Sequence, residues 1–293
     1  KVAHIRPMLS LKKVHSAAQV AAWAESINGA IIIEPKFDGI AASLIFGRDG
    51  RLVRAVTRGD GEKGDDITRH VMGILTRNNP AGGTIEADAD AAVEREIRGE
   101  IVITRPDFRE LNRVREHASQ PLFANRRNTA SGMVSRHDHT DAAAWLTFIQ
   151  YDPDWLVEGA ENSYSLCVTD PKFEHLVPFG TANPGSLDDP AIEQILADAE
   201  GFLMEMTDPE DFEVEFPVDT DGVVFKAFER EDRDRLGESS TAPRWAVAYK
   251  FPNRPKQTVL RAVEWAETRT GRVVPTAVFD PVELSGATVS RAT

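Results

Sequence analysis

Residues 31–39 read I-I-I-E-P-K-F-D-G, and this stretch decides the fold class. From Ile31 to Asp38 the side chains alternate with a period of two, which is typical of a β-strand. The two faces differ: one carries Ile31, Ile33, Pro35 and Phe37, and the other carries Glu34, Lys36 and Asp38. The pattern predicts a strand with a polar face that can line a site.

Further strands and helices are expected around this one. The expected strands are 44–46, 52–57, 96–103, 222–228 and 245–251, and the turn R-D-G at 48–50 makes the first two a hairpin. The expected helices are one capped by Ser16 and Gln19 and stopped at Gly29, one capped by Asp107 and Glu110, and one over 190–206 capped by Asp189. Because these elements are intermixed without a strict strand-helix-strand order, the sequence predicts an α+β fold around antiparallel sheets.

The pattern changes after the segment P-N-R-P at 252–255. From Thr258 onward the sequence has short β segments and no helical period. We therefore expect two domains, residues 1–255 and a small β domain over 256–293.

The composition is that of an ordinary globular protein and excludes several functional classes. Among 293 residues no run of eighteen apolar residues occurs, so neither a membrane span nor a secretion signal is expected, and we expect a cytoplasmic location. The single cysteine, Cys167, excludes an internal disulfide and a cysteine-rich zinc site. The net charge of -13 argues against nonspecific binding of nucleic acid by the whole surface, but it allows a local basic face.

Isolated charges lie among apolar or small residues on four of the expected strands. They are Glu34, Lys36, Asp38, Arg98, Glu100, Lys226 and Lys250. If these side chains converge, they form a cleft with the composition expected for binding phosphates and a metal ion. The alternative is four amphipathic strands whose charges face solvent.

The same residues belong to five motifs in a fixed order. They are K-F-D-G at 36–39, T-R-G-D-G at 57–61, R-G-E at 98–100, D-G-V-V-F-K at 221–226 and P-R-W-A-V-A-Y-K-F-P at 243–252. The first resembles the K-x-D-G signature of covalent nucleotidyltransferases, the superfamily of DNA ligases, RNA ligases and capping enzymes. The second and fifth, with P-M-L-S-L at 7–11 and F-A-N-R-R-N at 123–128, resemble the NAD-dependent bacterial DNA ligases over nearly the whole chain.

This resemblance implies a fold and an activity. The fold would be a nucleotidyltransferase fold, similar to that of ATP-grasp-like ligases, followed by an incomplete OB domain. The activity would be that of an NAD-dependent DNA ligase in DNA replication and repair. Lys36 would take AMP from NAD, the AMP would pass to the 5′-phosphate of a nick in double-stranded DNA, and the 3′-hydroxyl would seal the nick. The implied cofactors are NAD and magnesium, without a zinc site in this chain.

The resemblance also implies roles for individual residues. The catalytic set would be Lys36, Asp38, Lys226 and Lys250. The adenine nucleotide would be bound by Glu34 and Tyr151 at the base, Glu100 at the ribose, Arg58 at the ribose or phosphate, and a wall with Ser10 and Leu11. Magnesium would be held by Asp38 and Glu100, and DNA phosphates by Arg126, Arg127 and Arg136.

Chemistry explains why the lysines are needed. A lysine amine is a nucleophile only when it is neutral, so Lys36 needs desolvation or nearby cations that favour the neutral form. Lys226 and Lys250 are the expected cations. They would also neutralise the charge that builds on the α-phosphate as nicotinamide mononucleotide leaves.

The sequence departs from the family in several places. Arg126 stands where the family has proline, and T-A-S-G-M at 129–133 replaces a more uniform alanine-glycine stretch. The family's nicotinamide-recognising segment has no counterpart in these residues, and 256–293 resemble only the first part of a five-stranded OB domain. We therefore expect weak nucleotide binding, slow adenylation and no nick sealing by this chain alone.

Other interpretations stay open. One is a noncatalytic module that binds nicks or nucleotides, and another is one half of a split ligase whose partner chain supplies the missing segments. An ATP-dependent ligase or a capping enzyme is disfavoured, because the second and fifth motifs match the NAD branch. His137 and His139 lack a third ligand type nearby and are interpreted as surface residues.

Overall fold

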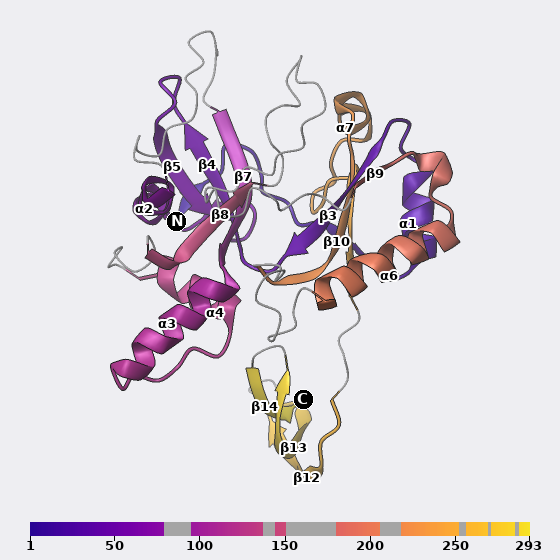
Figure 1. The fold of residues 1–293 in the computed structure, drawn as a ribbon. Helices are drawn as coiled ribbons and strands as arrows, with labels where there is room; N and C mark the ends of the chain where they lie inside the picture. The colour runs from indigo at the N-terminus through magenta and orange to yellow at the C-terminus, as the bar shows by residue number, and fades with distance from the viewer. Residues whose placement is uncertain are drawn as a thin grey trace.

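The computed structural model contains two sheets that lie side by side, each with helices packed against it, and a smaller sheet near the C-terminus (Figure 1). It describes residues 1–78, 95–136, 144–150, 180–205, 218–251, 256–268, 271–284 and 287–293. Strand pairing is antiparallel except between β2 and β11. The predicted α+β class with antiparallel sheets is confirmed.

The first sheet has four strands in the order β5-β4-β7-β8. They are β4 (Ile40–Phe46), β5 (Leu52–Thr57), β7 (Arg95–Ile103) and β8 (Leu146–Gln150). Its helices are α2 (Thr68–Asn78), α3 (Arg105–His117) and α4 (Arg126–Val134). Alternate strand side chains point toward these helices, so Leu44, Ile101 and Met133 are buried in one core.

The second sheet has five strands in the order β2-β11-β10-β3-β9. They are β2 (Lys12–Val14), β3 (Ile31–Phe37), β9 (Gly180–Ala182), β10 (Thr220–Ala227) and β11 (Ala246–Lys250). Its helices are α1 (Ala17–Ala24), α6 (Asp189–Glu205), α7 (Arg230–Leu236) and the 3-10 turn η3 (Pro184–Ser186). Val20, Ile192 and Phe225 form part of its core. Strand β3 therefore lies inside the sheet, between β10 and β9, and most of its residues are buried.

Two small sheets complete the described structure. Strand β1 (Val2–Ala3) pairs with β6 (Lys63–Gly64) beside the first sheet. Strands β12 (Leu260–Glu267), β13 (Val273–Leu284) and β14 (Ala287–Ala292) form an antiparallel meander. The described residues of 256–293 are thus β structure, as the sequence predicted, while the domain boundary at 255 stays a prediction. No helix among the described residues has both the length and the apolar character that a membrane crossing requires.

The helix ends predicted from capping residues are partly wrong. Helix α1 is capped by Ser16 as predicted, but it ends at Ala24 rather than near Gly29. Helix α3 begins at Arg105, because the hydroxyl of Thr104 accepts a hydrogen bond from the amide of Asp107 at 3.2 Å. Asp107 therefore lies inside the first turn and is not the cap. Helix α6 is capped by the carboxylate of Asp188, one residue before the predicted cap. Neighbouring polar residues compete for the same amide donors, and the local sequence does not decide which one bonds.

Candidate active site

The two sheets meet at the K-F-D-G motif. Strand β3 belongs to the five-stranded sheet and β4 to the four-stranded sheet, so the chain crosses between them at Asp38 and Gly39. Glycine is required at this crossing, because a β-carbon on Gly39 would lie 2.4 Å from the carbonyl oxygen of Ile101. The close approach lets the Gly39 amide donate to the Glu100 carboxyl at 3.1 Å. The crossing therefore places Lys36 at the boundary between the sheets.

A cavity of about 730 Å³ lies at this boundary, a volume in the range of pockets that hold small ligands. Most of the residues predicted from the sequence line it: Ser10, Leu11, Glu34, Lys36, Arg58, Glu100, Arg127, Lys226 and Lys250. Asp38 is connected to the cavity by an ion pair with Arg127, which lines it. The charges of the four strands therefore converge on one cavity, whereas their individual roles stay predictions.

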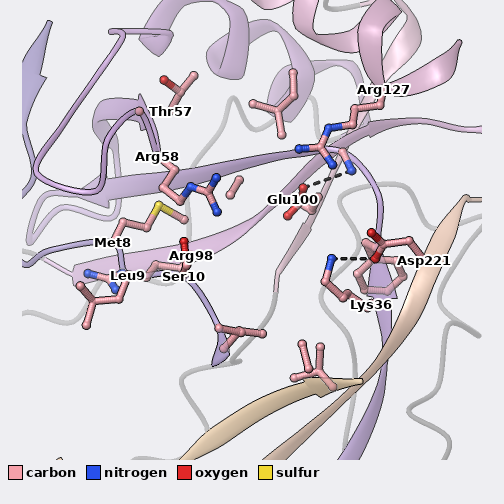
Figure 2. A pocket seen from close by; sticks show the side chains of 18 of the residues that line it. Met8, Leu9, Ser10, Lys36, Thr57, Arg58, Arg98, Glu100, Arg127 and Asp221 are labelled. Atoms are coloured by element: carbon pink, nitrogen blue, oxygen red, sulfur yellow. Dashed lines mark hydrogen bonds and ion pairs between the residues drawn. The ribbon is translucent and has the colours of Figure 1, made fainter. Parts of the chain in front are cut away.

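Lys36 forms an ion pair with Asp221, at the start of β10. Its Nζ lies 2.7 Å from Oδ1 of Asp221, and Nζ of Lys250 lies 3.1 Å from Oδ2 of the same carboxylate. A dashed line in Figure 2 marks the pair of Lys36 and Asp221. Burial by itself would raise the pKa of Asp221, but the hydrogen bonds and charges of Lys36 and Lys250 outweigh burial and lower it. Asp221 is therefore an ionised carboxylate that holds two of the predicted catalytic lysines together.

Lys226 pairs with Glu34 inside the protein. The two side chains come from the neighbouring strands β10 and β3, their charged atoms are 2.6 Å apart, and each is only 5% exposed. Both lysines that were expected to act on Lys36 as cations thus face a carboxylate, which weakens the positive field that they exert on Lys36. One of the expected cations thus forms a buried ion pair, and the other shares a carboxylate with Lys36, while their action on Lys36 stays a prediction.

Glu100 is buried beside the K-F-D-G crossing. Burial raises its pKa from the ordinary 4.5 to about 8, although the charges of Lys36 and Arg127 and the amide of Gly39 act in the opposite direction. The group is therefore largely protonated at neutral pH. A protonated carboxyl can donate a hydrogen bond to a hydroxyl, but it is a poor ligand for a cation.

We expect a pH-dependent stability difference between the wild type and Glu100→Gln. Between about pH 4.5 and pH 8 the folded protein binds a proton at Glu100 that the unfolded chain does not, so the wild type loses stability as the pH rises. Relative to the glutamine variant, the loss should be about 1.4 kcal/mol per pH unit in that window and should level off above it. Urea unfolding of both proteins from pH 5 to pH 9 measures the difference, and parallel curves would contradict the prediction.

The three arginines predicted to contact DNA have different surroundings. Nη2 of Arg126 donates to Asp219 at 2.6 Å, and the guanidinium lies 5.6 Å from the centre of the Phe108 ring. Arg126 therefore ties α4 to Asp219, the residue before β10. Arg127 faces the cavity, and Arg136 lies on the surface just after α4.

Some residues singled out from the sequence lie outside the described part of the chain. They are Tyr151, His137, His139 and Cys167. Within the described residues, no group of three or more histidine, cysteine, aspartate or glutamate side chains is arranged to hold a metal ion.

Asp221 was missed as a site residue, although it begins the D-G-V-V-F-K motif. Its partner Lys36 is 185 positions away in the sequence. Its other partner, Lys250, lies opposite the adjacent Gly222 in the β10-β11 pairing. Its position at the start of the motif was the signal that could have identified Asp221 as a site residue. Its two lysine partners could not be identified in the same way, because they depend on how the strands pair.

A cavity between two sheets that combines lysines, arginines and carboxylates is suited to a phosphorylated, anionic ligand. The geometry thus indicates a phosphorylated ligand, and comparison with known sequences shows the family to which the chain belongs.

The chain belongs to the family described as the NAD-dependent DNA ligase adenylation domain, whose sequence model matches residues 1–254. All of the chain aligns with "DNA ligase 1" of Nocardia farcinica at 37% identity over 294 residues, covering 40% of that protein. All of it also aligns with the "DNA ligase" of Thermomicrobium roseum, at 37% identity over 304 residues and 41% of that protein. The chain spans about 40% of the length of these curated relatives. The resemblance seen in the motifs is confirmed.

Proposed function

We propose that this chain carries out the adenylation step of an NAD-dependent DNA ligase, with Lys36 as the residue that accepts AMP. The observation that carries the proposal is the position of Lys36, which lines the cavity where the two sheets meet and is flanked there by Asp221 and Arg127. Membership of the adenylation-domain family supports NAD as the donor. NAD is a substrate in this reaction, because it is consumed.

In the proposed reaction, Nζ of Lys36 attacks the α-phosphorus of NAD. A P–N bond to AMP forms, the P–O bond to nicotinamide mononucleotide breaks, and that half leaves with the electron pair of the broken bond. An ion-paired ammonium is not a nucleophile, so Lys36 must first lose a proton. The carboxylate of Asp221 lies 2.7 Å from the amine and can pass the proton on to solvent, since its lowered pKa makes it a weak base that does not keep the proton.

The cavity residues divide between the two parts of the nucleotide. We assign Lys250, Arg58 and Arg127 to the phosphates, because these cations line the cavity. Ser10 and Leu11 are assigned to the wall around the adenosine, and the buried, protonated Glu100 to a ribose hydroxyl. Glu34 is assigned to the base, because it also lines the cavity, and stacking by Tyr151 stays a prediction from the sequence.

The carboxylates near Lys36 have donor chemistry that fits magnesium, which binds one or two carboxylates together with substrate phosphates. We propose Asp38 as the carboxylate that holds it, because the raised pKa of Glu100 disfavours that group at neutral pH. Asp38 accepts a hydrogen bond from Arg127 through Oδ1, and we assign its other oxygen to the ion. A bound magnesium ion would neutralise charge on the phosphate oxygens.

We propose nicked double-stranded DNA as the polynucleotide partner, since the relatives are named DNA ligases. Arg127 is the arginine best placed for a DNA phosphate, because it lines the cavity and its side chain is 50% exposed. A partner chain that supplies further ligase segments, and a cytoplasmic location, stay predictions from the sequence.

Intact mass spectrometry after incubation with NAD and magnesium tests the proposal. The expected result is a slow gain in mass by one adenylyl group, which an excess of nicotinamide mononucleotide reverses. ATP in place of NAD should give no adduct. A chain that binds AMP but gains no mass, even after prolonged incubation, would instead support the noncatalytic nucleotide-binding module.

A further inference from the structure

Residues 4–11, which we call the strap, form one wall of the cavity through Met8, Leu9, Ser10 and Leu11. The strap passes from one sheet to the other. The amide of Met8 donates to the carbonyl of Gly61 at 2.8 Å, beside the four-stranded sheet. The amide of Ser10 donates to Thr241 at 3.2 Å, and the chain then enters β2, which pairs with β11 of the five-stranded sheet.

Arg98 holds the strap from the side of the four-stranded sheet. Its Nη2 donates to the carbonyl of Arg6 at 2.9 Å, and its Nη1 donates to the carbonyl of Pro7 at 3.1 Å. The strap residues 5–11 lie outside any strand or helix, and Pro7 has no amide hydrogen to donate. The two bonds from Arg98 therefore fix consecutive peptide units immediately before Met8.

The guanidinium of Arg98 is itself held in place by Glu96. Nε of Arg98 lies 3.2 Å from Oε1 of Glu96, and the same oxygen accepts a hydrogen bond from the hydroxyl of Ser43 at 2.6 Å. The Glu96 side chain is 4% exposed. Burial by itself would raise its pKa, but the hydrogen bond from Ser43 and the charges of Arg98 and Arg6 outweigh burial and lower it. Glu96 is therefore an ionised, rigidly placed anchor for Arg98.

The strap faces a different part of the cavity from the reacting lysine. Figure 2 places Met8, Leu9, Ser10 and Arg98 on one side and Lys36 with Asp221 on the other. Phosphates must lie near Lys36 for the adenylation chemistry, so the strap is left to contact the nucleoside. Because Arg98 bonds to two carbonyls and to Glu96, its donors are directed at the protein rather than at a phosphate.

We propose that Arg98 is a positioning residue for nucleoside recognition: anchored by Glu96, it holds the carbonyls of Arg6 and Pro7 and thereby fixes the Met8–Leu11 wall before the ligand binds. The planar guanidinium can reach two adjacent carbonyls at once, whereas a lysine ammonium cannot reproduce that fork. This inference rests on the proposed function, because it assigns a nucleoside to the cavity.

The test compares Arg98→Lys and Arg98→Ala with the matched control Arg6→Ala. The control removes the exposed partner of Glu96 but leaves the backbone carbonyl that Arg98 holds. Isothermal titration with AMP and with adenosine measures binding, and amide hydrogen exchange at Met8 and Ser10 measures how firmly the strap is held without ligand. Thermal unfolding identifies any variant that loses its fold.

Both Arg98 variants should bind AMP and adenosine about tenfold more weakly, as expected when the binding-competent strap is populated about one-tenth of the time. Exchange at Met8 and Ser10 should become faster, while Arg6→Ala, which keeps both carbonyl bonds from Arg98, should change the two measurements far less than either Arg98 variant. Wild-type affinity in both Arg98 variants would overturn the proposal, and so would a loss confined to AMP, which would indicate a direct phosphate contact. If the wild type binds neither ligand, the proposed function fails, and the exchange measurement still decides whether Arg98 holds the strap.

Discussion

Lys36→Ala is expected to abolish covalent transfer of AMP while leaving the fold intact. The Lys36 side chain is 25% exposed at the edge of the cavity, and Asp221 keeps Lys250 as a partner when Lys36 is lost. The free energy of unfolding should therefore change by about 1 kcal/mol or less. The adduct should be lost, because the other amine at Asp221, Nζ of Lys250, is assigned to the phosphates and not to the attack on phosphorus. Intact mass and thermal unfolding of the purified variant measure the two effects.

Lys36→Arg is the matched control for the ion pair. Arginine keeps a positive charge opposite Asp221, but its guanidinium is not deprotonated in proteins and cannot act as the nucleophile. The arginine variant should therefore be as inactive as the alanine variant and at least as stable. Labelled AMP that survives denaturation on either variant would show that another residue is the acceptor.

Lys226→Ala and Lys250→Ala should both slow adenylation, by about 10²–10³-fold each: Lys250 is an electrostatic donor assigned to the phosphates, and Lys226 is a cation of the same cavity that also holds Glu34 in place. Their effects on stability should differ. Lys226 is almost fully buried against Glu34, so its loss leaves an unpaired buried carboxylate and costs about 3–5 kcal/mol of unfolding free energy. The Lys250 side chain is 40% exposed, and its loss should cost about 1 kcal/mol or less. Single-turnover adenylation and urea unfolding measure both quantities.

The double variant Glu34→Gln with Lys226→Met tests how much of the Lys226 effect comes from stability, and Glu34→Gln alone is the control for loss of the base contact. Removing both charges avoids the unpaired carboxylate, so most of the lost stability should return, while adenylation should stay slow. Wild-type adenylation rates in Lys226→Ala and Lys250→Ala would show that neither lysine acts on the phosphates. Recovery of the adenylation rate in the double variant would show that Lys226 acts only by supporting the fold.

Local pattern predicted the elements of the sheets well. The expected strand 52–57 coincides with β5, and the expected strand 222–228 differs from β10 by only a few positions, because alternation of apolar and polar residues is a property of the segment itself. The predicted starts of the helices near Asp107 and Asp189 were less accurate. There, adjacent polar side chains compete for the same amides, and small differences in geometry select Thr104 and Asp188.

The sequence by itself determined the family, the α+β class and the motif that contains Lys36, because these depend on residue types and on their order along the chain. Only the tertiary structure decided which carboxylate each lysine meets and that Arg98 holds the strap. Lys36 and Asp221 are 185 positions apart, and Arg98 is 92 positions from Arg6. Such contacts depend on the register of β3, β7, β10 and β11 and on the crossing at Gly39, and a shift of one residue in a strand would turn its charged side chains to the opposite face.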